Sequence, residues 1–387
     1  MRWIGLALGL LGIAVASLLA FGPGMVERAA QGVVPHDPHV VSEVARQRHA
    51  SLVVADWHAD SLLWNRDLLR EAQQGHVDFP RLDRGNVAIQ VFGAVTKTPR
   101  GMNYDSNDAG SDNITFLAAL QRWPLRTWSS LTERALYQAR KLARFAERAP
   151  DRVVLVRSAA DLRGVLERRE RGPDRPVAAL LLIEGGHALD GDLTNLERLD
   201  AAGFRVIGLH HFFDNRLGGS LHGRSRSGLT PFGREVVRAL EARQIIVDVA
   251  HSSPRVVEDV LAMATRPVVV SHTGLTAVCP SPRNLPDALM QRIAAAGGIV
   301  AIGYWDAVCD TSPRGVVASL RAAIDLLGED HVALGSDYDG GTWTTFDTSE
   351  LAILTQTMLD ASFSDDEIAK VMGENTRRFL LAQLPPR

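Results

Sequence analysis

Eight short apolar runs, rich in β-branched residues, alternate with amphipathic stretches along most of this chain. Such an alternation is typical of repeated strand–helix–strand units, which build a parallel sheet. Eight strands are the number that a closed α/β barrel of the (β/α)8, or TIM, type requires. The expected strands are Leu52–Trp57, Val87–Val95, Val177–Ile183, Phe204–Leu209, Ile245–Ala250, Val268–Ser271, Ile299–Tyr304 and Val332–Gly335.

A ninth apolar run and three helices complete the expected pattern. The run Val153–Val156 is assigned outside the barrel, because it carries no polar residue that would line a site. Capping serine or threonine followed by proline predicts helices over Arg255–Ala264 and Phe232–Arg243. The arginine-rich stretch Leu131–Arg148 is interpreted as a helix with a solvated outer face.

The bulk composition excludes some classes of protein. The chain has 387 residues, of which 46% are hydrophobic, so it can bury a core of the size that one elaborated barrel needs. Its formal net charge of -3 gives no long-range field that would recruit nucleic acid. A small neutral or zwitterionic substrate fits this charge better.

The N-terminus carries an uninterrupted apolar run, Trp3 to Phe21, behind the single positive charge of Arg2. The run reaches the length of a membrane span, which favours an uncleaved anchor. A secretory signal cleaved near Ala14-Val15-Ala16 is the alternative. Because positive charge tends to stay inside, either reading puts the remaining chain outside the cytoplasm.

Three segments are therefore expected along the chain. Residues 1–22 form the anchor or signal segment, residues 23–39 form a linker rich in glycine, proline and polar residues, and residues 40–387 form one catalytic barrel domain. The two cysteines, Cys279 and Cys309, are either paired in an oxidising compartment or two free buried thiols, and spacing does not decide between these.

Six of the eight expected strands end in histidine, aspartate or glutamate. Active sites of (β/α)8 barrels are built at the carboxyl ends of the strands, so these residues are candidates for function. The six ends are Asp56-Trp57-His58-Ala59-Asp60, Ile183-Glu184, Leu209-His210-His211, Asp248-Val249-Ala250-His251, Ser271-His272 and Gly335-Ser336-Asp337.

Five of these side chains form a candidate metal site. His58 and Asp60 lie two apart on an extended chain and so share one side of it. Imidazole nitrogen and carboxylate oxygen are the donors that catalytic Zn²⁺ takes. The five candidates are His58, Asp60, Glu184, His251 and His272. Five donors exceed what one tetrahedral zinc with an open position needs, so two ions that share Glu184 are predicted. Any one histidine is more simply a buried core residue, but burying the whole set without a cation would be costly.

Taken together, these motifs resemble those of the membrane dipeptidase (renal dipeptidase) family of zinc peptidases, within the amidohydrolase superfamily. The resemblance runs from about Leu52 to Leu381 and is densest from Ile183 to Gly340. The motifs that carry it are Asp56-Trp57-His58-Ala59-Asp60, Glu184-Gly185-Gly186-His187, Asp248-Val249-Ala250-His251-Ser252, Ser271-His272, Arg283-Asn284-Leu285-Pro286 and Gly335-Ser336-Asp337-Tyr338-Asp339-Gly340.

The resemblance implies a division of labour among these residues. His58, Asp60 and Glu184 would hold one zinc, while Glu184, His251 and His272 would hold the other, so that Glu184 bridges two Zn²⁺ ions per chain. Many amidohydrolases bridge their metals with a carboxylated lysine, but no lysine stands at an expected strand end.

Further roles follow from the same resemblance. His211, with His210 as the competing position, would contact the substrate carbonyl, Arg283 would bind the terminal carboxylate, and Asp337 would assist proton transfer. A hydroxide that bridges the zincs would attack the peptide bond of a dipeptide, including one with a D-residue at its C-terminal position. The resemblance also implies a disulfide between Cys279 and Cys309 and a homodimer.

Location and specificity are less constrained. The stretch Phe212–Ser220 resembles a bacterial form of its loop, which indicates a bacterial inner membrane with the domain on the periplasmic side, or the periplasm if the signal is cleaved. The segment Tyr304–Val308 departs from the mammalian pattern, so side-chain specificity stays open. Two alternatives remain: lactone, cyclic amide or phosphotriester hydrolysis on the same metals, and an inactive zinc- or ligand-binding module.

Overall fold

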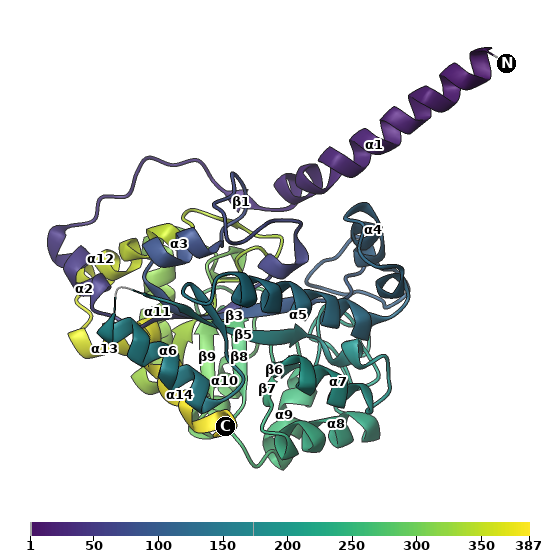
Figure 1. The fold of residues 1–387 in the computed structure, drawn as a ribbon. Helices are drawn as coiled ribbons and strands as arrows, with labels where there is room; N and C mark the ends of the chain where they lie inside the picture. The colour runs from purple at the N-terminus through teal and green to yellow at the C-terminus, as the bar shows by residue number, and fades with distance from the viewer. Residues whose placement is uncertain (1, 173) are drawn as a thin grey trace.

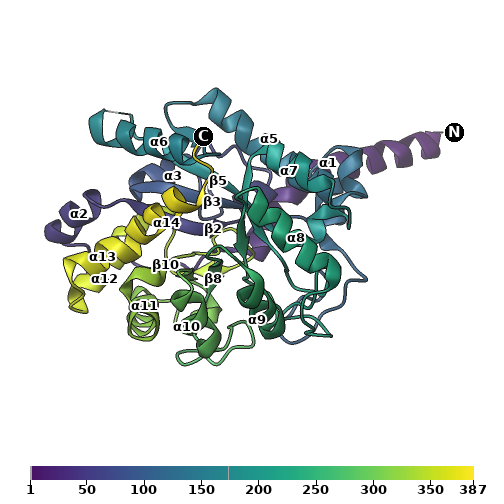
Figure 2. The same cartoon turned by 90° about the horizontal axis from the view of Figure 1, so that it is seen from below.

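Eight parallel strands form the centre of the molecule in a computed structural model, which describes residues 2–172 and 174–387. They follow one another in the order β2, β3, β5, β6, β7, β8, β9 and β10, each hydrogen-bonded to the next. Figure 1 labels these strands from β3 to β9, and Figure 2 also labels β2 and β10. Their bounds are β2 Val54–Ala59, β3 Val87–Val95, β5 Val177–Glu184, β6 Phe204–Gly208, β7 Ile246–Asp248, β8 Val269–Thr273, β9 Ile299–Ile302 and β10 Val332–Leu334. The eight predicted strands are thus confirmed.

The two ends of this sheet meet and close the barrel. An isolated parallel bridge joins Ala59 to Tyr338, and the Asp60 backbone N–H donates to the Tyr338 carbonyl at 2.8 Å. The Ser336 N–H donates to the buried carboxylate of Asp56 at 2.7 Å. These contacts tie the end of β2 to the segment after β10, so the fold is the predicted (β/α)8 barrel. The short strand β4, Val153–Leu155, pairs with β5 off this path, as predicted for the ninth run.

Helices cover the outside of the barrel (Figure 2). They are α2 Glu43–Ala50, α3 Phe79–Arg84, α4 Asn113–Leu120, α5 Leu131–Arg148, α6 Ala159–Arg171, α7 Asn195–Ala202, α8 Pro231–Ala242, α9 Pro254–Met263, α10 Asp287–Ala295, α11 Pro313–Leu327, α12 Ala352–Asp360, α13 Asp365–Ala369 and α14 Asn375–Gln383. The two predicted capped helices begin as expected, because the Thr230 and Ser253 side chains accept from backbone N–H groups of the first turn of α8 and α9.

The prediction that the basic side chains of α5 face solvent is wrong for two of them, Arg134 and Lys141. Arg134 is buried and donates to the Thr96 carbonyl and to Asp112, both at 2.6 Å. Lys141 is also buried and donates to the carbonyl of Trp64 at 2.6 Å. These side chains reach carbonyls of loops far away in the sequence, which compensates for their burial.

The N-terminal helix α1 spans Arg2–Ala30 and runs through Pro23, so it extends beyond the expected end at residue 22. The segment expected as a linker differs from a free tether. After α1, strand β1, Gly32–Val33, pairs in parallel with β11, Trp343–Thr344. The ordered unit therefore begins well before residue 40. Met1, the first residue of the expected segment, lies outside the described residues.

The outer part of α1 projects from the body of the molecule (Figure 1) and exposes large apolar side chains, Trp3 and Phe21 among them. Among the described residues, α1 alone is long and apolar enough to cross a membrane, with a mean hydropathy of 1.3 over Gly12–Ala30. Signal sequences pass the same test, so the helix is compatible with either an anchor or a signal.

Candidate metal centre

The five predicted ligands meet at the carboxyl ends of four barrel strands. His58 lies in β2 with Asp60 directly after it, Glu184 is the last residue of β5, His251 follows β7, and His272 lies in β8. All five side chains are at most 4% exposed. The chain therefore gathers three imidazoles and two carboxylates in one buried place.

Glu184 lies at the centre of this group. Its Oε1 is 3.2 Å from the Nε2 of His251, 3.4 Å from that of His272 and 3.6 Å from that of His58. The Oδ1 of Asp60 is 3.3 Å from the His58 Nε2. Two donors bound at ~2.05 Å to one tetrahedral ion lie ~3.3 Å apart. The donor atoms thus have the mutual spacing of metal ligands.

Three overlapping groups of donors converge here, each within 4.8 Å. One is the predicted set His58, Asp60 and Glu184. In the other two, His251 meets Glu184 and His211, and His272 meets His58 and Asp337. The Nε2 atoms of His251 and His272 are also only 2.9 Å apart. The centre is therefore contiguous, with His211 and Asp337 at its rim.

Several donor atoms in this centre approach charged neighbours without forming a hydrogen bond. Within the described residues, His58 Nε2, Asp60 Oδ1 and Glu184 Oε2 are buried and make no hydrogen bond. Leaving such atoms unpaired costs free energy, which a cation at the centre would recover. Nitrogen and oxygen donors in this number suit Zn²⁺. The donor set therefore fits the metal that the sequence implies.

The protonation of these groups also suits a cation. Burial lowers the pKa of His251 and of His272 well below its usual value, so both imidazoles are neutral, as ligands must be. Burial and the neighbouring Asp60 raise the pKa of Glu184. Burial would lower the pKa of His58 as well, but Asp60 and Glu184 outweigh it and raise that pKa to about 10. The neighbouring carboxylates of Asp60 and Glu184 thus favour a positive charge between them.

Ser271 orients two of the imidazoles and was missed as a functional residue in the sequence. Its Oγ is 2.8 Å from the Nδ1 of His272 and 3.5 Å from the Nδ1 of His58. Occupying Nδ1 on both rings directs each Nε2 into the centre, where a metal would bind. The only signal in the sequence is its position directly before His272.

The predicted substrate residues surround the centre. The His211 Nε2 is 3.2 Å from the Oε2 of Glu184, whereas His210 turns away and contacts Ser252 at 3.1 Å. Arg283 is 2% exposed, and its Nη2 is 3.2 Å from the Nε2 of His251. The geometry thus brings His211, rather than its neighbour His210, to the centre.

Asp337, which follows β10, has a left-handed backbone with φ 57°. His251, which follows β7, has the same conformation with φ 60°. Non-glycine residues rarely adopt this conformation, and such strain concentrates at functional sites. Burial raises the pKa of Asp337 to about 8, and Asp60 adds to this effect against the opposing charge of His58. The carboxyl group is therefore able to hold a proton near neutral pH.

A cavity of about 740 Å³ opens onto the centre. Its wall includes Asp60, Glu184, His211, His251, Arg283 and Asp337. A pocket of this volume holds a small organic ligand, and its converging polar groups are those of an active site.

Comparison with known proteins identifies the family. A model of the family described as "Membrane dipeptidase (Peptidase family M19)" matches residues 42–383. This chain belongs to the membrane dipeptidase family. It is thus a hydrolase of the metallodipeptidase type, as the motifs predict.

Relatives of known structure share the whole fold. A metallo peptidase of Rhodobacter sphaeroides, solved with a phosphinate mimic of the dipeptide L-Ala-D-Ala, is 25% identical with a TM-score of 0.72, and the match covers 86% of this chain and 99% of that one. The dipeptidase AC, a metallo peptidase of family M19, is also 25% identical with a TM-score of 0.72, over 87% of this chain and 100% of that one. The dipeptidase aclJ of Aspergillus oryzae is 28% identical over 353 residues, which cover 84% of this chain and 77% of that protein.

In this family member, Gly93 of β3 is a second residue that sequence reasoning missed. A Cβ at this position would lie 2.1 Å from Oδ1 of Asp60 and 3.2 Å from Nε2 of His58. The missing side chain leaves the space that the two ligands occupy. A glycine inside a strand is a weak signal of such close approach.

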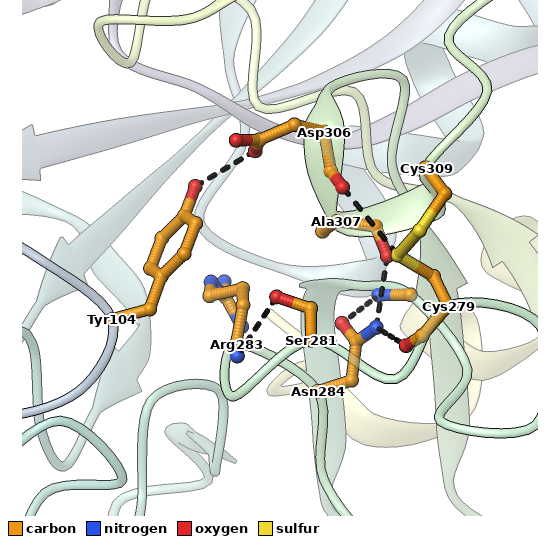
Figure 3. Close-up of a disulfide and its surroundings, with 9 residues drawn as sticks. Tyr104, Cys279, Ser281, Arg283, Asn284, Asp306, Ala307 and Cys309 are labelled. Carbon is orange, nitrogen blue, oxygen red and sulfur yellow. Dashed lines mark hydrogen bonds between the residues drawn. A yellow bond between two sulfur atoms is a disulfide. The ribbon is translucent and has the colours of Figure 1, made fainter.

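The predicted disulfide between Cys279 and Cys309 is present and joins the loop after β8 to the loop after β9 (Figure 3). Arg283 belongs to the loop after β8, four residues after Cys279, and its guanidinium is 5.3 Å from the ring of Trp305 in the loop after β9. The bridge and this cation–π contact hold Arg283 at the cavity from both loops.

Proposed function

We propose that this chain hydrolyses dipeptides at a pair of zinc ions held by His58, Asp60, Glu184, His251 and His272. The observation that carries the proposal is the convergence of buried donors at one point: the imidazoles of His58, His251 and His272 lie 3.2 to 3.6 Å from the Glu184 carboxylate, and Asp60 lies 3.3 Å from His58. Membership of the membrane dipeptidase family supports it independently.

In this proposal, His58, Asp60 and Glu184 hold one ion and Glu184, His251 and His272 hold the other. Support comes from the position of the Glu184 carboxylate, since its Oε1 lies within 3.6 Å of the Nε2 atoms of His58, His251 and His272, which belong to both proposed ligand sets. When bound, a pair of zinc ions supplies Lewis acidity and a water-derived nucleophile at neutral pH.

The side chains around the centre bind and orient the substrate. Arg283 clamps the free carboxylate of the dipeptide, because a guanidinium recognises a carboxylate with two parallel hydrogen bonds. His211 donates a hydrogen bond to the carbonyl oxygen as negative charge develops on it. Burial lowers the pKa of His211, so its imidazole is neutral and carries one proton to donate.

Asp337 moves the proton in this scheme. It accepts the proton of the attacking water on its carboxylate and gives it to the nitrogen of the leaving amine. Its pKa of about 8 suits both steps, since a group that titrates near the working pH serves as base and then as acid.

The substrate class follows from Arg283 and from the relatives. A buried guanidinium needs an anionic partner, which the C-terminal carboxylate of a short peptide supplies. The Rhodobacter sphaeroides relative was solved with a mimic of L-Ala-D-Ala, which supports a D-residue at the C-terminal position for this chain too.

We also propose that residues 2–21 of α1 anchor the enzyme in a bacterial inner membrane with the barrel on the periplasmic side. The exposed apolar side chains of this part of α1, among them Trp3, Ile13 and Phe21, support the proposal. A homodimer is expected from the family. Because residues 22–34 are ordered against the barrel, a soluble form for assays should begin before Gly22 rather than at Val40.

A panel of L,L- and L,D-dipeptides tests the proposed function, each also prepared as its C-terminal amide and assayed with and without chelator. We expect cleavage of free dipeptides, loss of cleavage with chelator and its return with Zn²⁺. Replacing the carboxylate by an amide should lower kcat/KM by about 10- to 100-fold, the value of a charge-assisted hydrogen bond. In Arg283→Gln, both forms should be cleaved at similar low rates. Hydrolysis of lactones or phosphotriesters with no cleavage of dipeptides would refute the proposal.

A further inference from the structure

The final turns of α1 form part of the wall of the active-site cavity. Val26 and Ala30 line the cavity that also contains Glu184 and Asp337. Both residues pack against the apolar cluster that contains Leu63 and Trp64. The apolar N-terminal helix therefore contributes directly to the space in which a substrate would lie.

Buried polar contacts fix this part of α1 in place. Glu27 is 2% exposed and forms an ion pair with Arg66 at 2.8 Å. Arg66 continues to Asp339 at 2.5 Å, and Gln31 reaches the same carboxylate at 3.1 Å. Asp339 lies two residues after Asp337, so the helix is bound to the loop that carries the proposed proton carrier.

Backbone and packing contacts complete the attachment. Gly32 and Val33 pair with Trp343 and Thr344, and the Gly341 N–H donates to the Gln31 side chain at 3.1 Å. A Cβ on Gly22 would lie 3.0 Å from Leu120 of α4, so the helix approaches α4 closely at this glycine. Side-chain, backbone and packing contacts thus attach the final turns of α1 to the barrel.

One part of the cavity lining is an apolar wall, formed by α1 together with residues after β2 and β3: Val26, Ala30, Leu63, Trp64, Ile114 and Phe116. Polar residues of the segment after β3, such as Arg100 and Asp112, line the cavity beside this wall. Arg283 lies in the loop after β8. In the ring of eight strands, β7 and β8 lie opposite β2 and β3. The strand before Arg283 and the two strands that lead into the apolar wall therefore stand on opposite sides of the barrel.

This placement orients a bound dipeptide. With its carboxylate on Arg283 and its peptide bond at the centre, the amino-terminal residue points to the apolar wall. The cavity, at about 740 Å³, has the volume of a drug-sized ligand and exceeds what two small residues fill. An apolar wall gains free energy when it covers an apolar side chain, by about 25 cal/mol per Å² buried.

We propose that Val26 and Ala30 of α1 are specificity-determining residues, which select dipeptides whose amino-terminal residue carries a large apolar side chain, such as leucine or phenylalanine. The proposal rests on the proposed dipeptidase function. It gives α1 a role in substrate selection as well as in membrane attachment.

The test uses the full-length enzyme in detergent and compares Phe-Ala with Ala-Ala, in the stereochemistry that the enzyme cleaves. Val26→Trp and Ala30→Leu place larger side chains on the apolar wall and so reduce the space for a phenylalanine side chain. The kcat/KM for Phe-Ala divided by that for Ala-Ala should therefore fall at least about tenfold, since one methylene in a hydrophobic pocket changes discrimination by about 10- to 200-fold. The matched control is Met25→Trp, next in sequence but 61% exposed and outside the cavity lining, which should leave the ratio unchanged.

A binding measurement separates this proposal from the dipeptidase proposal. If the wild type cleaves no dipeptide, the proposed function fails, and calorimetric affinities for the same two peptides then decide the role of the wall. Tighter binding of Phe-Ala that is lost in Val26→Trp or Ala30→Leu supports the proposal. An unchanged ratio in the variant that folds, or no binding of either peptide by the wild type, overturns it. A variant with the wild-type circular dichroism spectrum counts as folded, and Ala30→Leu carries the test if Val26→Trp does not fold.

Discussion

At the scale of single residues, the geometry of the metal centre depends on two residues outside the ligand set, Gly93 and Ser271. Asp60 and His58 occupy the space above Gly93, and Ser271 sets the orientation of two imidazoles through their Nδ1 atoms. Neither Gly93 nor Ser271 is a proposed ligand. Both fix where the ligands lie, and outer contacts of this kind change metal affinity or activity by about 10- to 100-fold.

Gly93→Ala tests this role. The added Cβ would lie 2.1 Å from Asp60 Oδ1, so the carboxylate must move away from His58. We expect zinc affinity and kcat/KM each to fall by about 10- to 100-fold while the fold is retained. Isothermal titration with Zn²⁺ and steady-state kinetics measure both.

The control for Gly93→Ala is Gly164→Ala, in helix α6, where a Cβ meets nothing within 4 Å. That substitution should stabilise the helix by about 0.5–1 kcal/mol and leave zinc affinity unchanged. Equal zinc affinity in Gly93→Ala and Gly164→Ala would show that the space above Gly93 does not matter.

At the scale of elements, the segment after β10 connects the metal centre to α1. Asp339 accepts hydrogen bonds from Ser61 at 2.6 Å and from the His76 N–H at 2.7 Å, besides its ion pair with Arg66. Burial alone would raise the pKa of Asp339, but Arg66, the His76 side chain and the Ser61 hydroxyl hold that pKa well below its usual value. The carboxylate is therefore charged in the folded protein at any physiological pH.

Asp339→Asn tests this network through its pH dependence. The folded pKa of Asp339 is depressed, so its contribution to stability is fully present above the unfolded pKa of about 3.9 and is lost as the pH falls. At pH 7 the free energy of unfolding should drop by about 3–5 kcal/mol, the cost of breaking a buried ion pair. Denaturant melts at pH 7 and pH 3 measure it.

The difference between wild type and Asp339→Asn should be constant from pH 5 to pH 8 and should shrink below about pH 4. Asparagine tolerates the left-handed backbone of this position, φ 62°, so the substitution adds no strain of its own. A difference that does not change between pH 7 and pH 3 would contradict the assignment.

At the scale of the whole molecule, the barrel and the convergence of the five proposed ligands were predictable from the sequence, because each of these residues stands at the end of an apolar run. His251 and His272 follow runs of β-branched residues, so a local pattern suffices to place them at the carboxyl edge of the barrel. The roles of Glu27 and Arg66 were not predictable in this way. Their partners lie 39 residues or more apart in the sequence, and no local periodicity reports such a contact.

The same reason explains the boundary of the N-terminal segment and the burial of Arg134. Glycine and proline near Gly22 are typical of a linker, but Gly22 instead permits a close contact with α4. A cation on a helix usually faces solvent, yet Arg134 finds carbonyl partners in loops that fold over it. Composition describes what a segment prefers locally, and tertiary contacts override it here.

Two truncations separate the membrane role of α1 from its role in the cavity. Removing residues 2–18 deletes only the exposed outer part, so the enzyme should leave the membrane fraction with kcat/KM unchanged. Removing residues 2–34 deletes Glu27 and Gln31 as well. The free energy of unfolding should then fall by about 1–3 kcal/mol, because the buried partners of these two residues lose their hydrogen bonds. Fractionation, kinetics and thermal melts follow both. Equal behaviour of the two truncated proteins would contradict the integration of α1 with the barrel.

The number of zinc ions per chain, counted by mass spectrometry of the metal in wild type and in Glu184→Gln, tests the central claim most directly. A centre in which Glu184 is shared predicts two zinc ions per wild-type chain and, in Glu184→Gln, fewer than one together with loss of dipeptide hydrolysis. Retention of two ions and of full activity in Glu184→Gln would contradict the shared carboxylate and the binuclear centre built on it.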